Sequence, residues 1–131
     1  MDVAADDVPW RPTSSPGVDW LLLGSDPPPA SEGAASERGA TVLIRMAPGR
    51  GYPAHRHIDV EDVLVLAGGY RDEDGVYRAG SYVRYEAGTS HAPVALGDSD
   101  RPAGPDNPAC LLFAVARGGV ALLDSDTPDE A

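Results

Sequence analysis

The segment GRGYPAHRHIDVEDVLVLAG, residues 49–68, contains two of the three histidines in this chain of 131 residues. In an extended segment, successive side chains point to opposite faces, so His55 and His57 share one face. Glu61 has the same parity and joins them after three intervening residues. The segment therefore predicts strands that gather two imidazoles and one carboxylate.

Short aliphatic and β-branched runs continue on both sides of this segment. Fifteen glycines and thirteen prolines favour many turns between short strands. No convincing amphipathic helix is found. Further strands are predicted at residues 18–23 (VDWLLL), 40–46 (ATVLIRM), 80–85 (GSYVRY), 111–116 (LLFAVA) and 119–123 (GVALL). The pattern predicts an all-β domain, either a sandwich or a barrel.

The length fits one domain with one hydrophobic core. We expect residues 1–16 to form an extended N-terminal segment, residues 17–124 the barrel, and residues 125–131 a disordered C-terminal tail. Residues 24–39, rich in Pro, Ser and Gly, are predicted to form a mobile loop. Residues 98–108 are predicted to form a solvated loop.

Charge and composition exclude several kinds of partner. The formal net charge is −11 and all ten basic residues are arginine, so there is no lysine patch or stripe that could neutralise a phosphate backbone, and nucleic acid is not an expected partner. No stretch approaches the roughly 20 apolar residues of a membrane helix, and we expect a cytoplasmic protein. The single cysteine, Cys110, excludes an internal disulfide and a zinc site made of several thiolates, and its apolar neighbours predict a buried strand.

The third histidine, His91, follows a predicted hairpin. The sequence Asp72-Glu73-Asp74-Gly75 lies between two short runs, and its Asp-Gly pair is a strong hairpin signal. If the hairpin folds the next strand back, His91 meets His55, His57 and Glu61. Three imidazoles and a carboxylate suit Fe, Mn, Ni, Co, Zn or Cu, but offer too few oxygens for calcium. From the residues alone, surface positions for the pair and a structural role for His91 remain an open alternative.

The spacing of these residues resembles the cupin superfamily. The first cupin motif is Gly, five residues, His-x-His, three or four residues, Glu, six residues, Gly. From Gly49 to Gly68 every fixed position of this motif is filled. The likeness extends over nearly the whole chain, from about Trp10 to Leu123.

The second cupin motif is Gly, five residues, Pro-x-Gly, two residues, His, three residues, Asn. Gly80, Gly88 and His91 are in register with it. Glu86 replaces the usual proline, which is expected to loosen that turn, and Ala95 replaces the usual asparagine. Neither departure removes a metal ligand that the resemblance implies.

Within the superfamily, the pattern Asp72-x-x-Gly75-x-Tyr77-x-x-Gly80-Ser81-Tyr82-x-Arg84 and His91-x-Pro93 are similar to the ChrR-like cupins. That group is named for the sensor domain of an anti-sigma factor and also contains aromatic-ketone dioxygenases. The resemblance implies a single cupin barrel (a double-stranded β-helix or jelly roll) and a homodimer. It also implies one divalent transition-metal ion, iron or zinc before Mn, Ni, Co or Cu, held by His55, His57, Glu61 and His91.

Three functions follow from that site. The first is a dioxygenase that cleaves a carbon–carbon bond of a small hydroxy-ketone or enediol on Fe(II). The second is a non-catalytic zinc-binding sensor or ligand-binding module. Anti-sigma factors of this group bind sigma factors through a separate zinc domain with its own His and Cys ligands, and beyond the three histidines this chain has only Cys110, so direct inhibition of a sigma factor is not expected. The third is a non-redox metal-dependent isomerase or lyase. Candidate pocket residues are Tyr52, Tyr82 and Arg84, with Tyr70, Tyr77, Tyr85 and Trp20 as further candidates.

Overall fold

The computed structural model of the chain describes residues 8–26, 39–118 and 120–122. The predicted tail at residues 125–131, most of the predicted loop at residues 24–39, and residues 1–7 lie outside the described residues. No helix in the described part of the chain is long and apolar enough to cross a membrane. The strands are β1 (Arg11–Pro12), β2 (Val18–Asp26), β3 (Gly39–Met46), β4 (His55–His57), β5 (Glu61–Ala67), β6 (Gly69–Asp72), β7 (Gly75–Arg78), β8 (Tyr82–Tyr85), β9 (Ser90–His91), β10 (Val94–Ala95), β11 (Cys110–Ala116) and β12 (Val120–Leu122).

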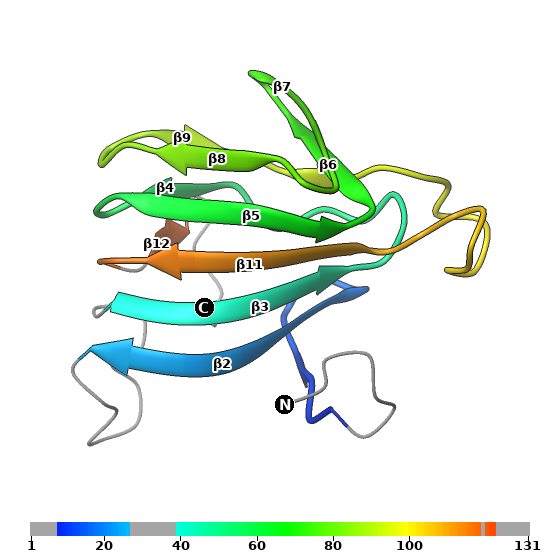
Figure 1. Cartoon of the computed structure of the whole chain (residues 1–131), viewed down its shortest axis with the longest axis horizontal. Helices are drawn as coiled ribbons and strands as arrows, with labels where there is room; N and C mark the ends of the chain where they lie inside the picture. Colours follow the sequence, from blue (N-terminus) through cyan, green and yellow to red (C-terminus); the bar gives the residue numbers. More distant parts are fainter. Residues whose placement is uncertain (1–7, 27–38, 119, 123–131) are drawn as a thin grey trace.

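These strands form one large sheet and two small ones. The large sheet has the order β1-β2-β3-β11-β5-β8, and the small sheets have the orders β10-β6-β7 and β12-β4-β9. Figure 1 shows the large sheet as one layer, with β4 and β12 behind it. The predicted all-β fold is confirmed. The backbone hydrogen bonds do not close one continuous barrel, and the arrangement is that of a jelly roll.

Alternation along β5 and β11 separates the two faces of the large sheet. Along β5, Glu61, Val63 and Val65 are buried, whereas Leu64 and Leu66 are exposed. Along β11, alternate residues from Cys110 to Ala116 are buried in the same way. The inner face carries the core, in which each fully buried aliphatic side chain contributes about 1.5–3 kcal/mol. The core cluster consists of Val18, Val42, Met46, Tyr52, Val63, Val65, Tyr70, Tyr85, Ala95, Cys110, Leu112 and Ala114.

The predicted hairpin joins β6 to β7. Asp72 and Gly75 are register partners across the turn, and Asp72 Oδ1 accepts hydrogen bonds from the backbone N–H groups of Asp74 (2.9 Å) and Gly75 (3.2 Å). An aspartate that bonds the backbone two residues ahead is a common way to close a turn. The turn thus fixes Asp72 from the solvent side and leaves its second oxygen pointing inward.

The turn before His91 forms with glutamate where cupins usually have proline. The carbonyl oxygen of Glu86 accepts hydrogen bonds from the Thr89 backbone N–H (3.2 Å) and the Thr89 hydroxyl (2.6 Å). Gly88 has φ of 86°, in the left-handed region that favours glycine. The turn therefore has its own hydrogen bonds, and the departure from the motif does not prevent it from closing.

Residues 98–108 connect β10 to β11 and are exposed except for Gly104 and Asn107. Asn107 is only 3% exposed. Its side chain accepts a hydrogen bond from the backbone of Asp98 and donates to the carbonyl oxygens of Asp98 and Arg101. One buried amide thus organises a largely solvated loop, which the sequence predicted without this anchor.

Candidate metal centre

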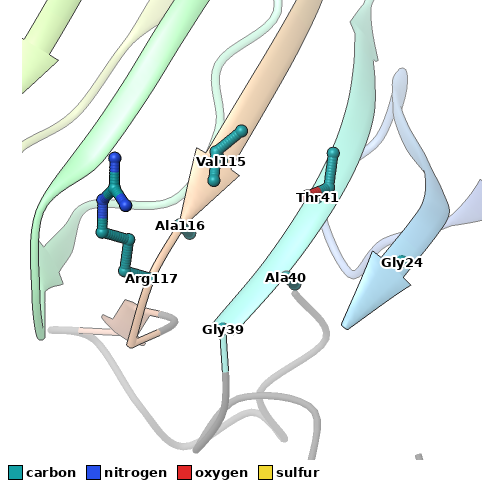
Figure 2. A pocket seen from close by; sticks show the side chains of 7 residues that line it. All are labelled: Gly24, Gly39, Ala40, Thr41, Val115, Ala116 and Arg117. Carbon is teal, nitrogen blue, oxygen red and sulfur yellow. The ribbon is translucent and has the colours of Figure 1, made fainter. Parts of the chain in front are cut away.

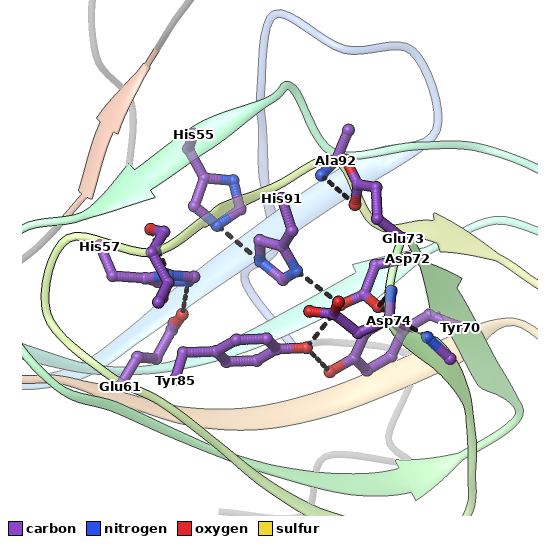
Figure 3. Close-up of polar contacts among 12 residues, drawn as sticks. His55, His57, Glu61, Tyr70, Asp72, Glu73, Asp74, Tyr85, His91 and Ala92 are labelled. Atoms are coloured by element: carbon purple, nitrogen blue, oxygen red, sulfur yellow. Dashed lines mark hydrogen bonds and ion pairs between the residues drawn. The ribbon is translucent and has the colours of Figure 1, made fainter.

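Four polar residues converge behind the large sheet. His55 and His57 lie on β4, Glu61 begins β5, and His91 ends β9. β4 pairs with β9, and His55 and His91 are direct register partners. One ligand atom from each residue lies within 4.8 Å of the others, and all four residues are buried. Figure 3 shows them pointing toward one another. The structure thus brings together the four residues predicted from the sequence, and metal binding by them stays a prediction.

Each histidine points its Nδ1 at an oxygen atom. The acceptors are Pro53 O for His55 (2.9 Å), Thr89 O for His57 (3.0 Å) and Asp72 Oδ2 for His91 (2.9 Å). Carbonyl and carboxylate oxygens accept hydrogen bonds, so each Nδ1 carries a proton and each neutral ring has its lone pair on Nε2. Three Nε2 lone pairs therefore face the centre of the cluster.

The Nε2 atoms are too close for an arrangement without a cation. His55 Nε2 and His91 Nε2 lie 3.0 Å apart, where two lone pairs repel each other. His57 Nε2 lies 2.8 Å from Glu61 Oε1, but without hydrogen-bond geometry. Within the described residues, His57 Nε2 is the one buried side-chain nitrogen or oxygen that lacks a hydrogen-bond partner. A proton or a metal ion among these four atoms removes the conflict, so the residues fit a divalent cation.

Burial keeps His55 and His91 in the neutral form that binds metal. Burial, followed by the nearby His91, lowers the pKa of His55 to about 4. Burial also lowers the pKa of His91, and it outweighs the hydrogen bond to Asp72, which acts in the opposite direction. Both rings are therefore neutral near pH 7, and a metal ion does not have to displace a proton from them.

Two tyrosines pack against the histidine rings. The rings of Tyr52 and His55 meet edge-on, with their centroids 5.1 Å apart and an interplanar angle of 81°. The ring of Tyr85 stacks on the ring of His57, with the centroids 4.7 Å apart and an interplanar angle of 17°. Tyr85 also donates a hydrogen bond to Asp72. Sequence reasoning did not single out Asp72 for this site, although its parity with buried Tyr70 across Arg71 was a signal of an inward side chain.

The other candidate pocket residues are not brought to the cluster. Tyr82 is 61% exposed, and its hydroxyl donates to Asp62 Oδ1 (2.5 Å). Arg84 is exposed, and its Nε donates a hydrogen bond to Glu86 Oε2 (3.1 Å). Because Tyr82 and Arg84 have the parity opposite to Tyr85 on β8, they lie on the outer face of the sheet. Trp20 and Tyr77 pack against the core. Substrate contact by any of these residues stays a prediction.

A pocket of about 480 Å³ lies elsewhere, where β2, β3 and β11 approach the end of the large sheet (Figure 2). Among the described residues that line it, Arg117 is the one charged side chain, and it donates a hydrogen bond to Asp62 Oδ2 (2.8 Å). None of the four cluster residues lines it. The lining residues are Gly24, Gly39, Ala40, Thr41, Val115, Ala116 and Arg117.

Comparison with known proteins gives one family and many similar folds. Residues 1–100 match the family model described as the ChrR Cupin-like domain. No curated protein matches the chain. The crystal structure of Rhodobacter sphaeroides SigE in complex with the anti-sigma ChrR contains a chain that is 28% identical, with a TM-score of 0.62. That match covers 84% of this chain and 49% of the other, so this chain spans about half the length of that relative.

Two further structures have similar folds. An RmlC-like cupin protein from Ralstonia eutropha JMP134 is 25% identical with a TM-score of 0.67, over 95% of this chain and 73% of the other. An acetylacetone dioxygenase from Acinetobacter johnsonii is 17% identical with a TM-score of 0.69, over 100% of this chain and 83% of the other. At that identity the dioxygenase shows a shared fold.

Proposed function

The chain belongs to the ChrR cupin-like family, and from this premise we propose that it binds one divalent transition-metal ion and acts on a small molecule at that ion. The proposed ligands are His55, His57, Glu61 and His91. The observation that carries the proposal is that one ligand atom from each of the three histidines and from Glu61 lies within 4.8 Å of the others. A buried set of this kind is stable when a cation lies among its members.

The donor atoms narrow the choice of metal. Imidazole nitrogens with one carboxylate oxygen suit iron and zinc first, and also Mn, Ni, Co and Cu. Cys110 is not available as a soft ligand, because it lies on β11 in the core cluster, and burial raises the pKa of its thiol to about 12. One carboxylate leaves a single positive charge on a divalent ion, which favours an anionic or enolised oxygen ligand.

We propose that the reaction is the cleavage of a carbon–carbon bond by O2, so that the chain is a dioxygenase. The proposed substrate is a hydroxy-ketone, enediol or diketone. A bound iron ion would supply Lewis acidity toward the substrate oxygens and activation of dioxygen. The reaction balances without an external reductant, since one carbon–carbon bond breaks and each fragment receives one oxygen atom of O2. The role of the chain is to hold the ligand nitrogens rigidly, through three Nδ1 hydrogen bonds and the packing of Tyr52 and Tyr85. The shared fold of the Acinetobacter johnsonii acetylacetone dioxygenase supports this choice.

The second candidate is a non-catalytic zinc-binding module that senses a ligand. It is favoured by the 28% identity to a chain of the SigE–ChrR complex, which is higher than the 17% identity to the dioxygenase. Metal content and oxygen consumption separate the two candidates. A zinc module is expected to be purified with zinc and to consume no oxygen with any ketone.

The first test is the metal content of protein purified without chelators, followed by metal titration of two variants. His57→Ala removes a proposed ligand, whereas the matched variant Arg56→Ala changes the exposed neighbour between the two histidines. We expect one metal ion per chain in the wild type and in Arg56→Ala, and a loss of affinity of at least about 100-fold in His57→Ala. Equal affinity in both variants contradicts the ligand assignment.

The second test is oxygen uptake by the iron-loaded protein with hydroxy-ketones and diketones. We expect substrate-dependent uptake of one O2 per substrate, with both atoms of ¹⁸O2 recovered in the products. Uptake that is equal in wild type and His57→Ala, or the absence of uptake with an iron-loaded wild type, contradicts the dioxygenase proposal.

A further inference from the structure

Asp72 lies next to the proposed metal centre without belonging to the four-residue cluster. It ends β6 in the small sheet β10-β6-β7, and its side chain is fully inaccessible (0% exposed). Its Oδ2 accepts hydrogen bonds from His91 Nδ1 and from the Tyr85 hydroxyl, each at 2.9 Å. Its Oδ1 accepts the two backbone N–H groups of the β6–β7 turn. Both oxygens are therefore fixed, one by the turn and the other by the site.

Four hydrogen-bond donors surround the buried carboxylate of Asp72. They are the His91 ring, the Tyr85 hydroxyl and the backbone N–H groups of Asp74 and Gly75. A buried carboxylate is costly unless such donors surround it. The fold therefore stabilises a negative charge directly behind one proposed ligand.

The three histidines differ in the group that accepts the hydrogen bond from Nδ1. Neutral backbone carbonyls accept from Nδ1 of His55 and His57, whereas a carboxylate accepts from Nδ1 of His91. A carboxylate partner polarises the ring and makes its other nitrogen a stronger donor to a metal ion. His91 is thus the ligand whose binding strength depends on a second charged side chain.

Tyrosines hold Asp72 in this orientation. Because Tyr85 donates to the carboxylate, its oxygen accepts the hydrogen bond from the Tyr70 hydroxyl at 2.5 Å. The ring of Tyr85 also contacts the His91 ring at 4.4 Å. Figure 3 shows the continuous chain from Tyr70 through Tyr85 and Asp72 to His91. The chain links the core to one proposed ligand and leaves the carboxylate little freedom to rotate.

We propose that Asp72 is a positioning residue of the metal centre, which fixes Nε2 of His91 as the metal-binding nitrogen and strengthens its bond to the metal. This inference rests on the proposed metal site. Tyr85 is the residue that orients Asp72 for this role.

The test compares Asp72 with Asp62, a carboxylate that also accepts from a tyrosine but lies on the outer face. Affinities for Co²⁺ and Zn²⁺ are measured by competition with a chromophoric chelator, and the visible absorption of the Co²⁺ protein reports the ligand field. Asp72→Ala is expected to weaken binding by about 10- to 100-fold. Asp72→Asn keeps an oxygen for His91 but removes the charge, so a smaller loss and a shifted Co²⁺ spectrum are expected. Asp62→Ala and Asp62→Asn are expected to bind like the wild type.

A readout on the metal-free protein tests the same role independently. Long-range ¹H–¹⁵N NMR of the His91 ring is expected to show the proton on Nδ1 in the wild type and in Asp62→Asn, and a mixture of both tautomers in Asp72→Ala. If Asp72→Ala does not fold, Asp72→Asn and Tyr85→Phe decide the matter with the same measurements.

The outcomes distinguish this inference from the proposed function. If the wild type binds no metal, or if His57→Ala binds as tightly as the wild type, the metal site itself is wrong. If the wild type binds metal and His57→Ala does not, but Asp72→Asn matches Asp62→Asn in affinity and Co²⁺ spectrum, only the role of Asp72 is wrong.

Discussion

Two tyrosine–aspartate pairs start from the same strand and have different surroundings. Tyr85 and Tyr82 both lie on β8, and each donates a hydrogen bond to an aspartate. The inner pair, Tyr85–Asp72, is buried against the histidine cluster. In the outer pair, Tyr82 is 61% exposed and the Asp62 side chain is 18% exposed, and Asp62 also accepts a hydrogen bond from the exposed Arg117. The same chemical contact thus occurs once in a low-dielectric site and once at the surface.

The comparison shows how burial decides what such a contact does. In water-accessible surroundings, hydrogen bonds and ion pairs replace similar bonds to water and contribute about 0–1 kcal/mol. In a buried network, each unpaired donor or acceptor costs about 1–3 kcal/mol, so the loss of one partner lowers the free energy of unfolding by a similar amount. The inner pair is therefore expected to affect both stability and metal binding, whereas the outer pair is expected to contribute little to stability and nothing to metal binding.

The largest expected effect is stabilisation by the metal ion. At a free metal concentration of 100 times the wild-type dissociation constant, the free energy of unfolding should rise by about 2.7 kcal/mol in the wild type and in Asp62→Ala. In Asp72→Ala, with about 10- to 100-fold weaker binding, the rise should be only about 0.4 to 1.4 kcal/mol. Urea denaturation with and without metal measures both values. An equal rise in the two aspartate variants would remove the distinction between the pairs.

The next effect concerns the metal-free protein. Asp72→Ala leaves the His91 N–H and the Tyr85 hydroxyl without their buried acceptor, so a loss of about 1–3 kcal/mol in the free energy of unfolding is expected. Asp62→Ala is expected to lose less than about 1 kcal/mol, because water replaces the carboxylate. Urea denaturation in the presence of a chelator measures both losses. A larger loss in Asp62→Ala would contradict the comparison.

A smaller effect is expected from the tyrosine hydroxyls. Tyr85→Phe removes the donor to Asp72 and the acceptor for Tyr70 within the core, so a loss of about 1 kcal/mol is expected. Tyr82→Phe removes an exposed hydroxyl that water can replace, so the change in unfolding free energy should be smaller than that of Tyr85→Phe. Both substitutions keep the aromatic ring, so denaturation curves report the hydroxyl alone. If the two curves shift equally, burial of the inner pair has no energetic consequence.

The sequence predicted those parts of the site that depend on local spacing. Alternation along an extended chain placed His55 and His57 on one face, and β4 has that form. The Asp-Gly signal predicted the hairpin between β6 and β7, which the structure confirms. Spacing within a strand follows from backbone geometry, which is the same in every protein.

The hydrogen bonds behind the ligands could not be predicted in this way. The contact between His91 and Asp72 depends on how the two small sheets lie against each other, which no local pattern determines. Alternation on β8, however, was enough to separate Tyr85 from Tyr82 and Arg84, because side chains of opposite parity cannot face one site. The sequence-based choice of all three as pocket candidates did not apply this rule.

The smallest expected effect is the pH dependence of the outer pair. Hydrogen bonds from Tyr82 and Arg117 lower the pKa of Asp62 below its usual value of 3.8. A carboxyl with a depressed pKa contributes stability that is fully present above 3.8 and is lost as the pH falls through the lower, folded-state pKa. The small difference in unfolding free energy between wild type and Asp62→Asn should therefore be present at pH 6 and disappear in strong acid. Titrations of the histidines occur in both proteins and cancel.

Salt separates the two pairs in the same experiment. At about 1 M salt the screening length is about 3 Å, so the contribution of Asp62 and its exposed partner Arg117 should decrease at pH 6. The difference between wild type and Asp72→Asn should persist under these conditions, because ions do not enter the buried network around His91. Denaturation of the three proteins at low and high salt measures this. If salt reduces both differences equally, Asp72 is accessible to solvent ions, and its charge is then too well screened to strengthen one histidine ligand over the other two.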